Sequence, residues 1–168
     1  EYVPDMATQL LRTSMESGDI DICADYTGTG WMTHLANEYT PGTDNNEIYQ
    51  LVKNADTVNG FTWLDPIWNN NTYVLVSWPE FTEENNLTTL SDLATLYNSS
   101  DTQGRMFVNF EFSTRPDGLP ALQQHYGFTV PEKDLKTSGE GSSLLALQNR
   151  ECEVAMAFGT DAAIAKNG

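Results

Sequence analysis

The stretch Ser142–Asp161, SSLLALQNRECEVAMAFGTD, decides the fold. We expect a helix from Ser142 to Asn149 and a buried strand over Val154–Phe158, where apolar residues follow one another without interruption. Gly159-Thr160-Asp161 then opens a further helical turn. A helix, a strand and a helix in close succession are typical of proteins in which helices cover a sheet.

The same alternation runs through the rest of the chain. Short apolar or β-branched runs predict further strands at Ile20–Ala24, Phe61–Leu64, Thr72–Val76 and Met106–Phe110, and a loop at Tyr26–Gly30. Helical spacing and capping residues predict helices over Asp5–Ser17 and Asn45–Asn54, through Leu93 and Leu96, and through Leu122. The sequence therefore predicts an α/β protein with mainly parallel sheets.

The composition narrows the possible functions. The chain has 168 residues, 39% of them hydrophobic, which suits one compact domain or two small lobes. Eight basic against 24 acidic residues give a net charge of −16, which repels nucleic acids and anionic lipid headgroups. Such acidity more often accompanies solubility, export or a salty habitat than a binding site. No apolar run is long enough to span a membrane and no signal sequence is visible, so we expect any signal or anchor to have been removed.

Residues of the common catalytic and metal sites are sparse. Cys23 and Cys152 are too far apart for a CxxC metal site, and we expect two separate buried thiols. His34 and His125 have no serine, cysteine or carboxylate pair beside them in a recognisable nucleophile pattern, so we expect them to be surface or core residues. We therefore expect no catalytic residue, no metal and no cofactor.

Four stretches, in this order and at these separations, carry a family resemblance. They are GDID (18–21) with DYTGTG (25–30), WLDP (63–66) with NNTY (70–73), RPDGL (115–119) and AFGTD (157–161). Together they resemble the substrate-binding proteins of the glycine betaine, choline and carnitine ABC-transporter family. The resemblance runs the whole length of the chain, although none of the stretches is specific by itself.

The resemblance implies a two-lobed, periplasmic-binding-protein-like fold with the ligand in the cleft between the lobes. Residues 1–68 would form part of lobe one, residues 69–161 lobe two, and residues 162–168 the start of the return to lobe one. Because both ends of the chain fall inside predicted helices, we expect an excerpt that lacks parts of lobe one.

Aromatic residues are the first candidates for the binding site. A quaternary-ammonium group has no N–H to donate, so a protein holds it against electron-rich ring faces. The resemblance assigns this role to Tyr26, Tyr73 and Phe158, the last standing where the family usually has a tyrosine, and a fourth ring is expected beyond Gly168. Taken alone, an aromatic residue in a short strand is more often part of the core. Tyr26 is the exception, because it lies at a strand end beside a glycine-rich turn.

Polar residues would hold the other end of the solute. Arg115 could bind the carboxylate of a betaine, and its alternative role is a local ion pair with Asp117. Thr29 and Asn71 could also bond the solute's polar end. Alternatively, Thr29 caps the following segment and Asn71 closes a turn.

The resemblance thus implies the extracytoplasmic solute-binding component of an ABC transporter, not an enzyme. It would capture glycine betaine, or choline, carnitine or proline betaine, for osmoprotective uptake. Its partners would be this solute and the permease, and it would reach the membrane only through an anchor or permease outside this chain. The alternative is a ligand-sensing module that signals to a membrane partner. A third hypothesis, an enzyme, would require two acids with raised pKa values in a cleft.

Overall fold

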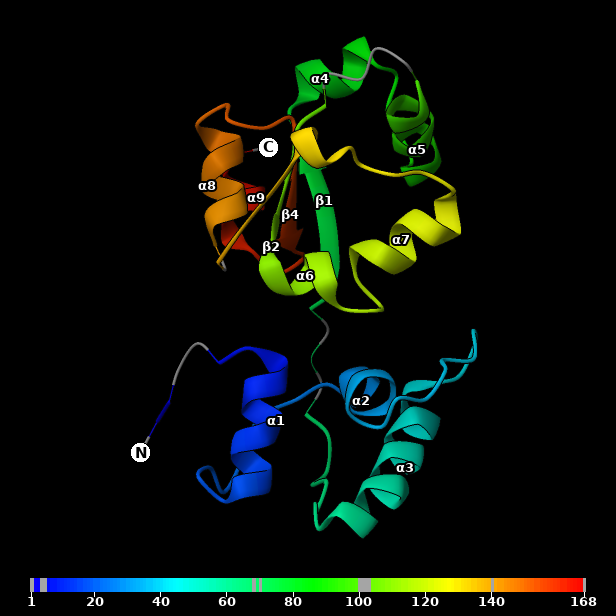
Figure 1. The fold of residues 1–168 in the computed structure, drawn as a ribbon, viewed down its shortest axis with the longest axis vertical. Coiled ribbons are helices and arrows are strands. Elements are labelled where there is room, and N and C mark those ends of the chain that lie inside the picture. Colours follow the sequence, from blue (N-terminus) through cyan, green and yellow to red (C-terminus); the bar gives the residue numbers. More distant parts are fainter. Residues whose placement is uncertain are drawn as a thin grey trace. The chain divides into compact units, whose positions relative to one another are not determined.

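The computed structural model describes residues 2–3, 6–67, 69, 71–99, 104–139 and 141–167. The chain divides into two compact units, residues 1–68 and residues 69–168, which we call unit 1 and unit 2 (Figure 1). This division is a property of the contacts within the chain. The predicted assignment of the segments to lobes of a larger fold stays a prediction.

Unit 1 is helical throughout its regular structure. Its elements are α1 (Thr8–Ser17), α2 (Thr27–Thr29), a π-helical turn η1 (Gly30–His34), α3 (Asn45–Asp56) and a 3-10 turn η2 (Thr57–Asn59). The predicted helices α1 and α3 are confirmed, although Asp5 lies outside the described residues. The side chain of Asp44 accepts hydrogen bonds from the backbone N–H groups of Asn46 and Glu47, and so fixes the start of α3.

The centre of unit 1 contains a buried ion pair. Both terminal nitrogens of Arg12 in α1 donate to the carboxylate of Asp56 at the end of α3, each at 2.8 Å. Asn59 and Trp63 donate to the same carboxylate at 3.0 and 2.9 Å. The ring of Trp63 also packs against Gly30, where a Cβ would lie 2.7 Å from that ring. These contacts tie α1, α3 and the α2–η1 segment together.

The two strands predicted in unit 1 are absent. Within the described residues of this unit no segment is paired in a sheet, and Ile22 and Leu64 of the predicted strands are 71% and 65% exposed. The prediction was wrong because a strand needs a hydrogen-bonded neighbour as well as a suitable sequence, and neither segment has one here. The prediction of two buried thiols was also half wrong, because Cys152 is buried and Cys23 is exposed.

Unit 2 is built on a four-stranded sheet in the order β1-β4-β2-β3. Its elements are β1 (Tyr73–Ser77), α4 (Pro79–Glu84), α5 (Leu90–Asn98), β2 (Met106–Asn109), α6 (Phe110–Thr114), α7 (Leu119–Tyr126), η3 (Glu132–Asp134), β3 (Leu135–Ser138), α8 (Ser142–Gln148), β4 (Val154–Phe158) and α9 (Ala162–Asn167). β2 runs parallel to β3 and to β4, whereas β1 is antiparallel to β4. The predicted α/β class with a mainly parallel sheet is confirmed.

Helices cover both faces of this sheet. α5 and α7 lie on one side and α8 on the other (Figure 1). β4 contributes side chains to both faces of the sheet. Val154 and Met156 belong to the apolar cluster under α5, α6 and α7. Ala155 belongs to the smaller cluster under α8. Unit 2 therefore has an apolar layer on each face of its sheet. In the part of the chain that the structure describes, no helix is both long and apolar enough to cross a lipid bilayer.

Candidate functional site

The β1–β4 pairing brings two predicted site residues into contact. Tyr73 opens β1 and Phe158 closes β4, and the two are direct partners in the antiparallel register. Their ring centroids are 5.3 Å apart, with the planes tilted by 32°. Phe112 of α6 lies on Tyr73 as well, with its centroid at 4.9 Å. Tyr73 and Phe158 are both half-buried, so they offer an aromatic surface that is supported from behind.

Arg115 reaches the same aromatic pair from the turn between α6 and α7. Its Nη1 donates to the hydroxyl of Tyr73 at 3.4 Å, and its guanidinium carbon lies 5.8 Å from the centroid of the Tyr73 ring. Burial raises the pKa of the Tyr73 hydroxyl, which therefore stays protonated. The structure thus gathers Tyr73, Phe158 and Arg115 at one end of β1 and β4.

Carboxylates hold this arginine in place. Asp117 accepts from Nε at 2.6 Å and from Nη2 at 2.9 Å, and Glu111, one helical turn earlier, accepts from Nη1 at 3.1 Å. Burial by itself would lower the pKa of the guanidinium, but the hydrogen bonds with Asp117 and the negative charges around the guanidinium together outweigh burial and raise the pKa. The ion pair weighed as an alternative role for Arg115 is therefore present, and it leaves the guanidinium in a fixed orientation.

The turn that carries Arg115 depends on a glycine. A Cβ at Gly118 would overlap the carbonyl oxygen of Phe112, so a larger residue would push α6 and α7 apart. The RPDG stretch thereby combines a tight turn with a charged side chain held by its own aspartate.

Asn71 links the two strands just beyond the ring pair. Its Oδ1 accepts from the hydroxyl of Thr160 at 2.6 Å and from the Thr160 backbone N–H at 3.3 Å. The backbone N–H of Gly159 donates to the carbonyl of Thr72 at 2.8 Å. Asn71 thus fixes the turn after β4 against the start of β1, in line with the structural role considered for it.

Tyr26 and Thr29 belong to unit 1. Tyr26 is the residue before α2 and is 46% exposed, whereas Thr29, inside the short helix, is buried. Tyr26–Gly30 was predicted to be a loop, but in the structure Thr27–Thr29 form α2 and Gly30 begins the π-helical turn η1. That these two residues face the four of unit 2 across a ligand stays a prediction.

Sequence reasoning missed two contacts of the group in unit 2 and one contact near Tyr26 in unit 1. Glu111 could have been found from its spacing of four residues before Arg115 in a helix. Phe112 and the partnership of Asp25 with His34 carried no such signal, because they depend on the packing of α6 and on a π-helical turn.

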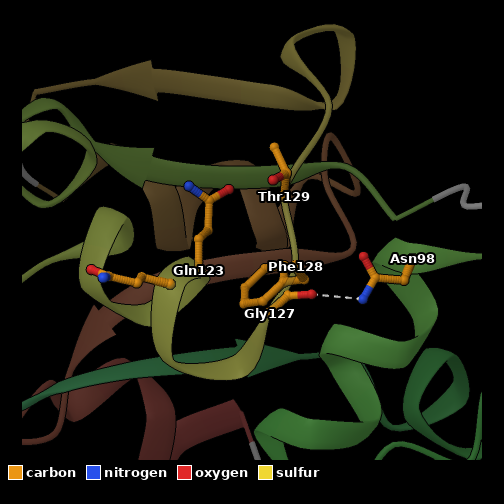
Figure 2. Close-up of a pocket in the computed structure, with 6 residues that line it drawn as sticks. Asn98, Gln123, Gly127, Phe128 and Thr129 are labelled. Atoms are coloured by element: carbon orange, nitrogen blue, oxygen red, sulfur yellow. Dashed lines mark hydrogen bonds between the residues drawn. The ribbon is translucent and has the colours of Figure 1, made fainter.

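A separate hollow in unit 2, of about 420 Å³, lies away from this group (Figure 2). Its lining residues are Asn98, Gln123, Gln124, Gly127, Phe128 and Thr129. The amide of Asn98 donates to the carbonyl of Gly127 at 2.9 Å, and Gln123 accepts from the backbone N–H of Val130 at 2.8 Å. These amides close the segment after α7, so the hollow is a product of structural contacts. Among the described residues no cluster of histidine, cysteine, aspartate and glutamate could hold a metal ion.

Comparisons with known proteins agree on one family. The family model described as "Substrate binding domain of ABC-type glycine betaine transport system" (OpuAC) matches residues 1–168. The chain is 30% identical over 167 residues to the glycine betaine-binding protein YehZ of Escherichia coli K12. The match covers 96% of this chain and 54% of that protein. It is 31% identical over 151 residues to a glycine-betaine-binding protein of Pseudomonas aeruginosa. This match covers 87% of this chain and 48% of that protein.

A third relative is named for another solute. The chain is 30% identical over 121 residues to the ergothioneine transport permease/ergothioneine binding protein EgtU of Helicobacter pylori, covering 72% of this chain and 21% of that protein.

Two solved structures share the fold. An apo structure of E. coli YehZ superposes with a TM-score of 0.55 at 31% identity, covering 96% of this chain and 59% of that one. A crystal structure of a glycine betaine/carnitine/choline ABC transporter superposes with a TM-score of 0.58 at 23% identity. The match covers 95% of this chain and 57% of that one. Both confirm the predicted fold class. The chain spans about half the length of the curated relatives it matches.

Proposed function

Since the chain belongs to the OpuAC family of substrate-binding domains of ABC-type glycine betaine transport systems, we propose that it captures a quaternary-ammonium solute for such a transporter. The family is one of substrate-binding proteins rather than enzymes. In this proposal the protein works outside the cytoplasm and delivers the solute to an ABC-transporter permease, for osmoprotective uptake.

The observation that carries the proposal is the contact of Tyr73 with Phe158 across β1 and β4. Two ring faces 5.3 Å apart, backed by Phe112, form a surface on which an ammonium head wrapped in methyl groups can lie. Each ring contributes about 0.5–2 kcal/mol, so three or four rings supply much of a micromolar affinity. Tyr26 from unit 1 is the third ring of the proposed cage.

The position of Arg115 favours a solute that carries a carboxylate at the end opposite its ammonium head. Its guanidinium is already bonded to Asp117 and Glu111, so a solute carboxylate would have to share these hydrogen bonds or replace one. Glycine betaine and ergothioneine, the solutes for which the relatives are named, both combine a trimethylammonium head with a carboxylate. We therefore propose a carboxylate-bearing betaine over choline, which would leave the guanidinium without this added partner.

Isothermal titration calorimetry of the 168-residue chain with glycine betaine tests the proposal. Choline, carnitine, proline betaine and ergothioneine complete the panel. Removing a ring face by Tyr73→Ala should weaken the binding of glycine betaine about tenfold, because it costs about 1.4 kcal/mol of ring contact. The matched control is Tyr39→Ala, which removes an exposed tyrosine outside the proposed cage and should leave the affinity unchanged.

Arg115→Gln separates the two ends of the solute. This substitution should weaken the binding of glycine betaine more than the binding of choline, because only glycine betaine has a carboxylate that can bond the guanidinium. An absence of both binding heat and a shift in thermal unfolding with every solute in the panel would refute the proposed function. Equal losses for Tyr73→Ala and Tyr39→Ala would refute the aromatic cage.

A further inference from the structure

A histidine with a buried side chain contacts Asp25, the residue before Tyr26, and lies outside the set of residues assigned to the solute. The Nε2 of His34 is 2.7 Å from Oδ2 of Asp25, and Oδ1 of the same carboxylate accepts the backbone N–H of Tyr26 at 2.7 Å. The side chain of His34 is 3% exposed and that of Asp25 is 17% exposed. One carboxylate thus connects a buried imidazole with the backbone of a residue that carries an exposed ring.

The element that carries His34 is held firmly. His34 ends the π-helical turn η1, whose defining bond runs from the N–H of Leu35 to the carbonyl of Gly30 at 3.1 Å. Gly30 is closely packed, because a Cβ there would lie 2.7 Å from both Trp63 and Val52. A π turn holds one residue more than an α turn, which rotates the following side chains by about 100° around the axis. His34 therefore approaches Asp25 from a closely packed, hydrogen-bonded turn.

The second ring nitrogen of His34, Nδ1, distinguishes a polar role of this side chain from simple packing. Within the described part of the chain, Nδ1 of His34 is buried and has no hydrogen-bond partner. A buried polar atom without a partner is destabilising, and an apolar side chain at this position would avoid that cost. The imidazole is therefore accounted for by the contact of Nε2 with Asp25 rather than by packing.

We propose that His34 is a positioning residue for Tyr26. By holding Asp25, it fixes the backbone at the entry to α2 and with it the direction in which the Tyr26 ring meets the solute. The inference rests on the proposed function, in which Tyr26 is a wall of the cage.

Two variants of similar polarity test the role of Nε2. In His34→Gln the side-chain nitrogen is as many bonds from Cα as Nε2, so it can still donate to Asp25. In His34→Asn the nitrogen corresponds to Nδ1 and falls short. We expect glycine betaine to bind His34→Gln within about twofold of the unchanged chain and His34→Asn about tenfold more weakly, a loss in the range that misplaced contact groups produce. His125→Asn, at the exposed second histidine, is the control and should bind normally.

A second measurement needs no solute. An N–H that donates to a carboxylate at 2.7 Å resonates far downfield, so the proton shift of the Tyr26 amide in ¹H–¹⁵N spectra reports its bond to Asp25. The shift should persist in His34→Gln and move upfield in His34→Asn. Thermal unfolding of each variant confirms that it is folded.

The outcomes separate the two proposals. If the unchanged chain binds no glycine betaine, the proposed function fails, and the Tyr26 amide shift alone decides whether His34 holds Asp25. If the chain binds and the Gln and Asn variants bind equally well, or lose affinity equally, the positioning role of Nε2 is overturned.

Discussion

Asp56 is the most heavily hydrogen-bonded carboxylate among the described residues of unit 1. Burial by itself would raise its pKa, but the bonds from Arg12, Asn59 and Trp63 outweigh burial and lower the pKa to about 2. The folded form thus prefers the ionised carboxylate more than the unfolded chain does. Asp56 therefore stabilises the protein above its unfolded pKa of about 4, and this stabilisation is lost as the pH falls through about 2.

Asp56→Asn should lower the free energy of unfolding at pH 7 by about 3 kcal/mol, because it leaves the guanidinium of Arg12 without its buried counter-charge. Urea unfolding measured between pH 7 and pH 2.5 should also show a flatter pH dependence in the variant. Asp21→Asn, at an exposed site, serves as the control and should follow the unchanged chain. Parallel curves for all three proteins would contradict the role assigned to Asp56.

At the scale of single elements, α5 illustrates how local sequence starts a helix. The hydroxyl of Thr89 accepts from the N–H of Asp92 at 3.2 Å, and the carboxylate of Asp92 accepts from the N–H of Thr89 at 2.8 Å. This reciprocal capping box holds the first turn, and α5 in turn places Leu93 and Tyr97 in the larger apolar cluster.

Thr89→Ala should therefore destabilise the protein by about 1 kcal/mol, the usual loss on removing a helix cap. Ser91→Ala, two residues later on the exposed side of the same turn, is the matched control and should change stability by less than about 0.5 kcal/mol. Urea unfolding at neutral pH measures both. Equal effects would mean that the cap does not limit the stability of α5.

The elements that the sequence predicted well are those whose signal is local. α3, α5, α8 and β4 each have their own apolar pattern, and the first two have capping residues as well. α6 was missed because the Met106–Phe110 run continues past the point where Asn109 turns the chain, by accepting the N–H of Phe112 at 2.7 Å. β3 reads LKTS, and only its pairing with β2 makes it a strand.

The candidate site divides in the same way. The YTGT, RPDG and FGTD turns were visible in the sequence, and so was a pairing of Arg115 with Asp117 as one of two roles for the arginine. The contact of Tyr73 with Phe158 depends on the antiparallel register of β1, an exception in a sheet predicted to be mainly parallel. Asp25 and His34 are separated by a turn whose π-helical form has no recognisable sequence signal, so their contact could not be predicted.

For the molecule as a whole, the net charge of −16 is the dominant electrostatic feature. Like charges repel one another most in the compact state, so screening them by salt should stabilise the folded chain. Raising NaCl from about 0.01 M to about 0.15 M shortens the Debye length from about 30 Å to about 8 Å. We expect the midpoint of thermal unfolding to rise by about 1–2 °C over this range, a change of about 0.5 kcal/mol.

A variant with fewer charges provides the comparison. Glu38, Glu83 and Glu132 are exposed, and their joint replacement by glutamine should reduce the salt dependence while leaving the fold unchanged. A midpoint that falls with salt in the unchanged chain would show that ion pairs at the surface outweigh the general repulsion.

The position of β4 has a consequence for how unit 2 is made. β4 is the last of the four strands to be synthesised, yet it lies between β1 and β2. During translation β1 therefore leaves the ribosome before β4, its one partner among the described strands, and its edge stays open until Val154–Phe158 has emerged. Because Tyr73 and Phe158 are partners in the same register, their rings can meet only at that step. The nascent chain thus completes its sheet and its pair of aromatic faces in one event.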